Sequence, residues 1–374
     1  MLFKNAMIFM PSHTFARGSF RVEDGKFTEI LTDVPNQKGI DLQGALVIPG
    51  LVDVHTHGNS GADFSDGDLA GIQAMAAYSA KNGITSFAPA SMTLPYGVLA
   101  KAYAAAGTYA DNRPRGGARL MGIHMEGPYF SEKKKGAQNG EYLRLPDFDG
   151  FKKLYEDCGG LIRIVDVAAE LPGAAEFAAQ ASRLCTVSIA HTDANYEQAC
   201  AVFDSGATHL THLFNAMPSI HHRNPAVIGA ASERNIRAEL ICDGLHVHPS
   251  SVRMAFKLFP GRICLISDSL RCCGMPDGEY ELGGQTAYLK DNIARLADGT
   301  IAGAATNLYD DMCNAVRFGI PTEEAVTAAT ERPAQAINAF DRIGSIEVGK
   351  YADFVVCDAD LTRRKVYIGG EAIE

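Results

Sequence analysis

Eight short apolar segments recur along the chain, and a stretch with helical character, such as 68–81 or 196–205, follows each of them. The apolar segments are Leu46–His57, Thr85–Ala90, Leu120–Glu126, Ile162–Ala169, Thr186–His191, Thr208–Phe214, Arg237–Asp243 and Ile263–Asp268. Near-continuous apolar strands that alternate with helices indicate a parallel sheet covered by helices. Eight such units over roughly 290 residues predict a (β/α)8 TIM barrel. The alternative is a doubly wound open sheet, but no G-x-G-x-x-G motif follows the first strand.

The two ends of the chain differ from this middle part. Short alternating segments separated by turn residues, such as 19–22, 27–30 and 352–357, are typical of antiparallel strands. We therefore expect an α/β protein in which residues 1–48 and 343–374 form one small β-sandwich domain and residues 49–342 form the barrel. A further stretch, Tyr280–Leu296, is typical of a β-hairpin inserted after the eighth strand.

Charge and cysteine content exclude several classes of function. The chain has 34 basic and 44 acidic residues, a net charge of −10, and no basic run is longer than the three residues of Lys133–Lys135. This balance argues against nucleic-acid and anionic-membrane partners, and no apolar run approaches the ~18 residues of a membrane span. Nine cysteines without a C-x-x-C spacing are typical of reduced thiols in a cytoplasmic protein.

Polar side chains stand at the carboxyl ends of five predicted strands, where barrel enzymes build their sites. These residues are His55, His57, Glu126, His191, His212 and Asp268. A lone histidine at a strand end is more often structural than a ligand, and we interpret His13, His124, His209 and His248 in that way. Structural histidines and carboxylates that arose independently would not all stand at the carboxyl ends of the predicted strands. The six residues together therefore predict a metal site.

The donor set narrows the kind of metal. Imidazole and carboxylate ligands without cysteine suit a catalytic Zn²⁺ or a similar first-row ion with an open coordination position. Cys272 and Cys273 lie just past the eighth strand, but adjacent cysteines cannot easily bind one ion. We therefore interpret both as packing residues.

Two segments resemble a known group of enzymes. Pro49–Gly58 resembles the first-strand signature of the amidohydrolase superfamily, and Gly344–Asp353 resembles the segment that returns its chain to the small domain. Within that superfamily the chain is similar to the N-acetylglucosamine-6-phosphate deacetylase family along nearly its whole length. The matching motifs are His124–Tyr129, Ala190–Thr192, Thr211–Met217, Asp243–His246 and Gly274–Gly278.

The resemblance implies metal-dependent hydrolysis of the acetamide of N-acetylglucosamine 6-phosphate, with a small amino-sugar phosphate as substrate. It gives Glu126, His191 and His212 as principal metal ligands and Asp268 as the catalytic residue. His55 and His57 make a second ion plausible, so we expect one or two divalent ions, Zn²⁺ or Fe²⁺. The resemblance implies substrate contacts by Ala137, Gln138, Asn215, Ala216, Arg223, His246, Ile301 and Gly303. It also implies a homodimer in which a neighbouring subunit completes part of the pocket.

Some positions depart from the family pattern. Ser267 and Ser269 flank Asp268 where the family commonly has threonine and alanine, and Leu270–Cys273 replaces a stretch that is usually alanine-rich. Gln138 stands where some members have histidine.

Two alternative functions stay open: another amidase or deacylase of the superfamily acting on a related N-acyl substrate, and a metal-free binding protein. Ile162–Ala169 contains no lysine that could become a carboxylated ligand, which favours the deacetylase type.

Overall fold

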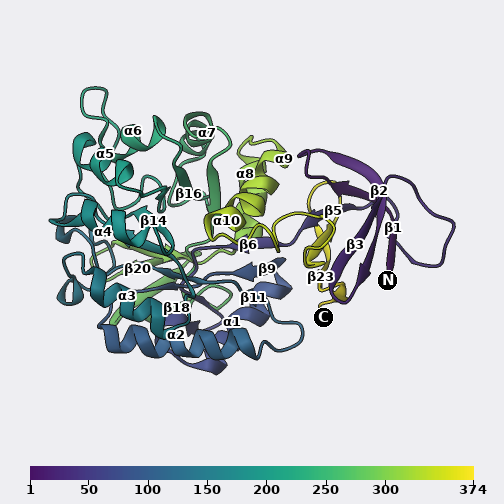
Figure 1. Ribbon diagram of the computed structural model, residues 1–374, viewed down its shortest axis with the longest axis horizontal. Coiled ribbons are helices and arrows are strands. Elements are labelled where there is room, and N and C mark those ends of the chain that lie inside the picture. Colours follow the sequence, from purple (N-terminus) through teal and green to yellow (C-terminus); the bar gives the residue numbers. More distant parts are fainter.

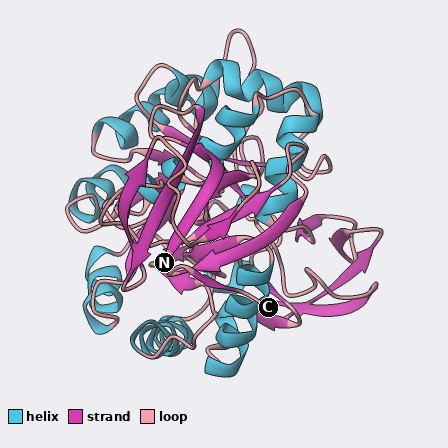
Figure 2. Cartoon of the chain, turned by 90° about the vertical axis from the view of Figure 1, so that its right-hand side faces the viewer, coloured by secondary structure: helices cyan, strands magenta, loops and turns pink.

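The computed structural model describes residues 1–374, apart from the side chain of residue 364. It consists of a barrel of strands enclosed by helices and a small sheet domain beside it (Figure 1). The helices are α1 Leu69–Lys81, α2 Tyr96–Asp111, α3 Phe148–Asp157, α4 Ala174–Ala181, α5 Tyr196–Asp204, α6 Ala226–Ser232, α7 Pro249–Leu258, α8 Leu308–Arg317, α9 Thr322–Ala329 and α10 Glu331–Ala336. Figure 2 shows them around a central group of strands. Among the described helices, none has the length and apolar character that a membrane crossing requires.

The barrel strands form two parallel arcs. They are β6 Leu51–Asp53, β9 Ile84–Phe87, β10 Ala90–Ser91, β11 Arg119–Leu120, β12 Ile123–Met125, β13 Ile162–Val167, β14 Thr186–Ile189, β15 His209–Leu210, β16 Arg237–Ile241 and β17 Ile263–Ile266. The order is β10-β12-β13-β14-β15-β16-β17 in one arc and β11-β9-β6 in the other. The barrel closes beyond β17, where the backbone N–H of Asp268 donates to the carbonyl of His55 at 2.9 Å. The predicted (β/α)8 barrel is therefore confirmed, and the open sheet is excluded.

The first predicted strand, Leu46–His57, is wrong as a single element. It is divided at Gly50 into β5 (Leu46–Pro49), which pairs with the small domain, and β6, which belongs to the barrel. A side chain at Gly50 would place its Cβ only 2.0 Å from Oγ1 of Thr85 on β9. The chain therefore needs glycine where it passes from one sheet to the other.

Both ends of the chain build the small domain, as predicted, and Figure 1 shows the purple and yellow segments side by side. Its other strands are β1 Leu2–Phe9, β2 Phe15–Glu23, β3 Lys26–Leu31, β4 Ile40–Asp41, β22 Phe354–Cys357, β23 Arg363–Ile368 and β24 Glu371–Ala372. They form one hydrogen-bonded path, β24-β23-β22-β5-β1-β2-β3, and β4 pairs with β1 beside it. Rings of Phe3, Phe20, Phe354 and Tyr367 pack together inside it.

An inserted antiparallel sheet follows β17. The predicted hairpin at 280–296 is part of a four-stranded meander of β18 Gly278–Leu282, β19 Gln285–Lys290, β20 Ile293–Leu296 and β21 Ile301–Ala304. A short pair, β7 Gly58–Asn59 and β8 Ala62–Asp63, follows the first barrel strand. We propose domain boundaries at 48/49 and 342/343, and the break at Gly50 between the two sheets supports the first of them.

Candidate active site

The six polar residues predicted at strand ends converge at one end of the barrel. Oε1 of Glu126 lies 3.1 Å from Nε2 of His191 and 3.2 Å from Nε2 of His212. Its Oε2 lies 3.2 Å from Nε2 of His57, which is 3.4 Å from Oδ1 of Asp268. Nε2 of His55 lies 3.6 Å from both carboxylates. The Glu126 carboxylate therefore stands between two groups of donors.

The backbone at the strand ends turns these side chains inward. His191, His212 and Asp268 each stand two residues beyond their strand, and their φ angles are 43°, 30° and 48°. Residues other than glycine rarely occupy this left-handed region, and each costs about 1–3 kcal/mol. Three such residues around one cavity indicate that the fold accepts local strain to aim the side chains.

The tautomers of two histidines leave lone pairs that face the cluster. Nδ1 of His191 donates to the carbonyl of Lys134 at 2.8 Å, so its Nε2 presents a lone pair when the ring is neutral. Nδ1 of His55 lies 2.9 Å from Oε2 of Glu239, and its buried Nε2 has no hydrogen-bond partner. Lone pairs that face carboxylates are satisfied by a cation, so these residues fit a divalent metal.

Two groups of ligand atoms are compact enough for an ion. The first is Glu126, His191 and His212, and the second is His55, His57 and Asp268; within each, the ligand atoms lie within 4.8 Å of one another. Glu126 reaches both groups through its two oxygens. The arrangement can therefore hold one ion, or two ions that share Glu126.

A third group with similar spacing, His55, His124 and Glu239, does not fit a metal. Nδ1 of His124 lies 3.0 Å from the carbonyl of Val54, and its Nε2 lies 3.0 Å from Oδ1 of Asp166. Burial alone would lower the pKa of His124, but the carboxylates of Asp166 and Glu239 raise it to about 9. An imidazolium that donates from both nitrogens has no lone pair for an ion.

The electrostatic surroundings of Glu126 keep its carboxylate negatively charged at the centre of the site. Burial alone would raise the pKa of Glu126, but the surrounding histidines outweigh it and hold that pKa well below its usual range. Burial opposes protonation of His212, yet the hydrogen bond to Glu126 raises the pKa of His212 to about 9. Without a metal the ring of His212 therefore holds its proton, and binding of a dication releases it.

A cavity of about 200 Å³ opens over this cluster. The predicted residues that line it are His57, Glu126, Ala137, Gln138, His191, His212, Asn215, Ala216, His246, Asp268, Ile301 and Gly303. His55 lies beneath them, fully buried. The cavity is also lined by Met92, Gly136, Thr300 and Ala302. Ala302 lies on β21 of the inserted sheet, between Ile301 and Gly303, whose contact with the site the family resemblance implied.

Arg223 is not part of this lining. It is exposed on the loop before α6, where Nη1 lies 2.6 Å from Nε2 of its neighbour His222. His246 does reach the cavity, and its Nδ1 lies 2.6 Å from Oδ2 of Asp243. Among the described residues that line the cavity, none is lysine or arginine.

Several polar side chains support the site from behind. Gln138 donates its amide to Oε2 of Glu126 at 2.6 Å and accepts the N–H of Thr93 at 2.7 Å. Glu239, which sequence reasoning missed, is fully buried on β16 and contacts His55. A carboxylate in the middle of an apolar strand was the signal that could have found it. The hydroxyl of Ser267, which stands where the family commonly has threonine, donates to Oδ2 of Asp53 at 2.6 Å, and neither residue lines the cavity.

Comparisons with known proteins agree with this geometry. The sequence pattern that defines the amidohydrolase family matches residues 46–373 of this chain. The N-acetylglucosamine-6-phosphate deacetylase of Bacillus subtilis is 35% identical over 96% of this chain and 93% of its own. The N-acetylgalactosamine-6-phosphate deacetylase of Escherichia coli O157:H7 is 32% identical over 87% of each chain.

Solved structures extend the comparison to three dimensions. A variant N-acetyl-D-glucosamine-6-phosphate deacetylase from Mycobacterium smegmatis, in complex with N-acetyl-D-glucosamine-6-phosphate, superposes with a TM-score of 0.94 at 30% identity and covers 100% of this chain and 99% of its own. The enzyme from Pasteurella multocida gives 0.91 at 31% identity, over 99% and 98% of the two chains. The chain therefore belongs to the amidohydrolase family and, within it, to the N-acetylglucosamine-6-phosphate deacetylases.

Proposed function

We propose that this protein hydrolyses the acetamide of N-acetylglucosamine 6-phosphate to glucosamine 6-phosphate and acetate. The observation that carries the proposal is the convergence of Glu126, His191, His212 and Asp268 at the mouth of the barrel. Relatives that cover nearly the whole chain are named for this reaction, and one neighbouring structure is a complex with that sugar phosphate. Both the fold and the composition of the site therefore support the same chemistry.

Glu126, His191 and His212 would hold the principal metal, and His55, His57 and Asp268 would hold a second ion. We propose Zn²⁺ or Fe²⁺, because the donor set consists of imidazole and carboxylate groups. When bound, such an ion lowers the pKa of water towards ~7 and polarises the acetyl carbonyl. Gln138 holds Glu126 by a 2.6 Å bond, so the ligand is oriented before substrate arrives.

Asp268 is proposed as the general base and acid. Burial alone would raise its pKa, but His55 and His57 outweigh burial and lower it, so Asp268 is a carboxylate at neutral pH. It can accept the proton of the attacking water and pass it to the departing nitrogen, a role worth ~10²–10⁴-fold in rate. An amide needs this help because its nitrogen leaves as a neutral amine only after it has received a proton.

The cavity supports recognition of the sugar phosphate by Ala137, Asn215, Ala216, His246, Ile301 and Gly303. A phosphate dianion needs stronger cationic donors than this lining offers. We propose that Arg223, exposed on its loop, reaches the pocket of a neighbouring subunit in a homodimer, where its planar fork binds phosphate. We further propose a cytoplasmic setting, which free thiols such as Cys158 and Cys264 support.

Release of acetate from N-acetylglucosamine 6-phosphate tests the proposal. The metal-free protein would be assayed alone and after addition of Zn²⁺ or Fe²⁺, with the unphosphorylated sugar and N-acetylgalactosamine 6-phosphate as parallel substrates. We expect metal-dependent release that is strongest with the first substrate. Release only from other N-acyl compounds would favour a different amidase of the family, and lack of metal-dependent release from any of them would overturn the proposal.

A further inference from the structure

A second cavity, of about 240 Å³, lies at the opposite end of the barrel from the active site. Its lining residues are Ala110, Arg113, Arg119, Leu120, Met121, Leu161, Arg163, Arg342 and Tyr351. Arg119 is the first residue of β11 and Arg163 is the second of β13, so both stand at the amino ends of their strands. Four arginines from separate parts of the chain thus meet around one space, where the barrel adjoins the small domain.

Only one of these arginines has a close carboxylate. Arg119 binds Asp353 through two bonds of 2.7 and 3.2 Å and lies 3.9 Å from the ring centre of Tyr351. Nε of Arg342 lies 3.7 Å from Oδ1 of its exposed neighbour Asp341, a distance at which an exposed pair contributes little. The positive charge of the cluster is therefore far from balanced by the protein itself.

The other two arginines have no carboxylate partner among the described residues. Nη1 of Arg113 donates to the carbonyl of Gly117 at 2.7 Å. Burial, and after it the nearby Arg119, lowers the pKa of the Arg113 guanidinium, while the carboxylate of Asp353 acts in the opposite direction. Nε of Arg163 is buried without a hydrogen-bond partner.

The stem of Arg163 is held in place by a glycine. A side chain at Gly122 would put its Cβ 2.1 Å from Cγ of Arg163, so the arginine crosses directly over the Gly122 backbone. This close packing fixes where the guanidinium stands at the cavity. The position of Arg163 therefore follows from the packing of the barrel wall, which is characteristic of a built site more than of a freely moving surface arginine.

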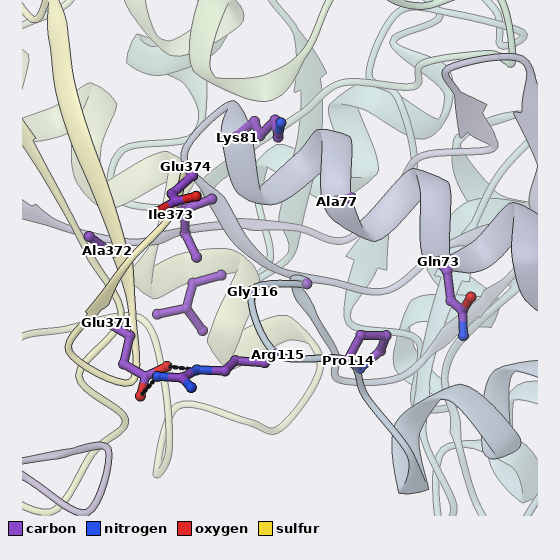
Figure 3. A pocket seen from close by; sticks show the side chains of 12 residues that line it. Gln73, Ala77, Lys81, Pro114, Arg115, Gly116, Glu371, Ala372, Ile373 and Glu374 are labelled. Carbon is purple, nitrogen blue, oxygen red and sulfur yellow. Dashed lines mark hydrogen bonds and ion pairs between the residues drawn. The ribbon is translucent and has the colours of Figure 1, made fainter.

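A larger cavity on the same segment provides a contrast. It measures about 730 Å³ and lies between α1, residues 114–117 and the C-terminal strand (Figure 3). There Arg115 binds Glu371 through two bonds of 2.6 and 2.7 Å, and Lys81 is accompanied by Glu374. Its two positive side chains are matched by two negative ones. The larger cavity is thus balanced in charge, unlike the cavity with four arginines, in a chain whose net charge is −10.

We propose that the cavity lined by Arg113, Arg119, Arg163 and Arg342 is a binding site for a phosphate group, either free phosphate or the phosphate of a small phosphomonoester. Guanidinium forks bind phosphate oxygens through paired, charge-assisted hydrogen bonds. An anion here would offset the like charges of the guanidinium groups that line the cavity, including those of Arg113 and Arg119. It would also tie the barrel to the small domain, because Tyr351 and Arg342 lie near the start of the returning segment.

Thermal unfolding of the full-length protein in increasing inorganic phosphate tests this site, with KCl at matched ionic strength as the salt control. We expect phosphate to raise the melting temperature beyond the effect of KCl. In Arg163→Met the phosphate concentration that gives half the shift should rise at least tenfold, and Arg113→Met is the second variant in case the first does not fold. Arg115→Met is the matched control, since its guanidinium faces the balanced cavity, and it should respond like the wild type.

His246→Asn separates this site from the active site, which also offers phosphate contacts. A phosphate response that survives in His246→Asn and is lost in Arg163→Met supports the proposal. The reverse pattern, or an equal response to KCl, overturns it. Parallel titrations with glucose 6-phosphate and unphosphorylated glucose distinguish the sources: a lower midpoint for the sugar phosphate indicates a phosphomonoester, and equal midpoints with phosphate indicate the free ion.

Discussion

Glu239 offers a sharp test of how the barrel prepares the second metal position. Its carboxylate contacts Nδ1 of His55 at 2.9 Å, Nε2 of His209 at 3.1 Å and the backbone N–H of His212 at 3.3 Å. Burial alone would raise the pKa of Glu239, but His55 and His124 outweigh it and hold that pKa well below its usual range. The group is therefore charged, and it fixes the proton of His55 on Nδ1, which leaves Nε2 as a ligand.

The substitution Glu239→Gln keeps the shape but removes the charge. A hydrogen bond to a charged group contributes about 1.5–3 kcal/mol, and loss of such a bond behind a metal-binding histidine weakens the metal by about 10–100-fold. We expect this loss at the position formed by His55, His57 and Asp268. The position formed by Glu126, His191 and His212 should be little changed, because His191 is oriented by the carbonyl of Lys134.

The assay is titration of metal-free protein with Zn²⁺ by calorimetry, together with the metal content after gel filtration. The wild type should bind in two steps, and Glu239→Gln should keep the first and weaken the second. His209→Gln is the matched control, because it replaces the imidazole that contacts the other oxygen of Glu239 and leaves the bond to His55 intact. Equal weakening of both steps, the same loss in His209→Gln, or a single ion in the wild type would each contradict the reasoning.

Other predictions address the chemistry, the substrate and stability. Asp268→Asn should retain the principal metal at Glu126, His191 and His212 but lose at least ~10²-fold in turnover, and substantial acetate release by it would remove Asp268 from the mechanism. Arg223→Ala should raise KM far more for the phosphorylated than for the unphosphorylated sugar; equal losses on both would show that the loop does not contact phosphate. Burial raises the pKa of Asp53 to about 6. Since the unfolded value is ~3.9, the unfolded state ionises first, and stability should fall by about 3 kcal/mol as pH rises from about 3 to about 7. In chemical denaturation Asp53→Asn should show a decline that is smaller by this amount, because Asp63, whose pKa burial also raises to about 6, keeps its own contribution; an unchanged slope would refute the assignment to Asp53. Phe354→Ala should lower the free energy of unfolding by about 3–5 kcal/mol; a loss under 1 kcal/mol would show that the ring cluster adapts.

The sequence was sufficient for the barrel and for the residues at its strand ends, because alternation of apolar strands with helices and the motifs that follow them are local patterns. It did not reveal the break at Gly50, which depends on the approach of Thr85 from a strand more than thirty residues away. It likewise missed Glu239, whose role depends on which strands become neighbours. Contacts between the inserted sheet and the site are decided by tertiary packing, which no short window of sequence contains.

The origin of the small domain from both ends of the chain has a consequence for folding during synthesis. The ring of Phe3 rests on Phe354 and Tyr367, which leave the ribosome more than three hundred residues later. Native contacts of this separation form slowly, and domains generally fold as they emerge. The barrel can thus assemble while the first forty-five residues wait with Phe3 and Phe20 exposed, and the last strands then complete the small domain.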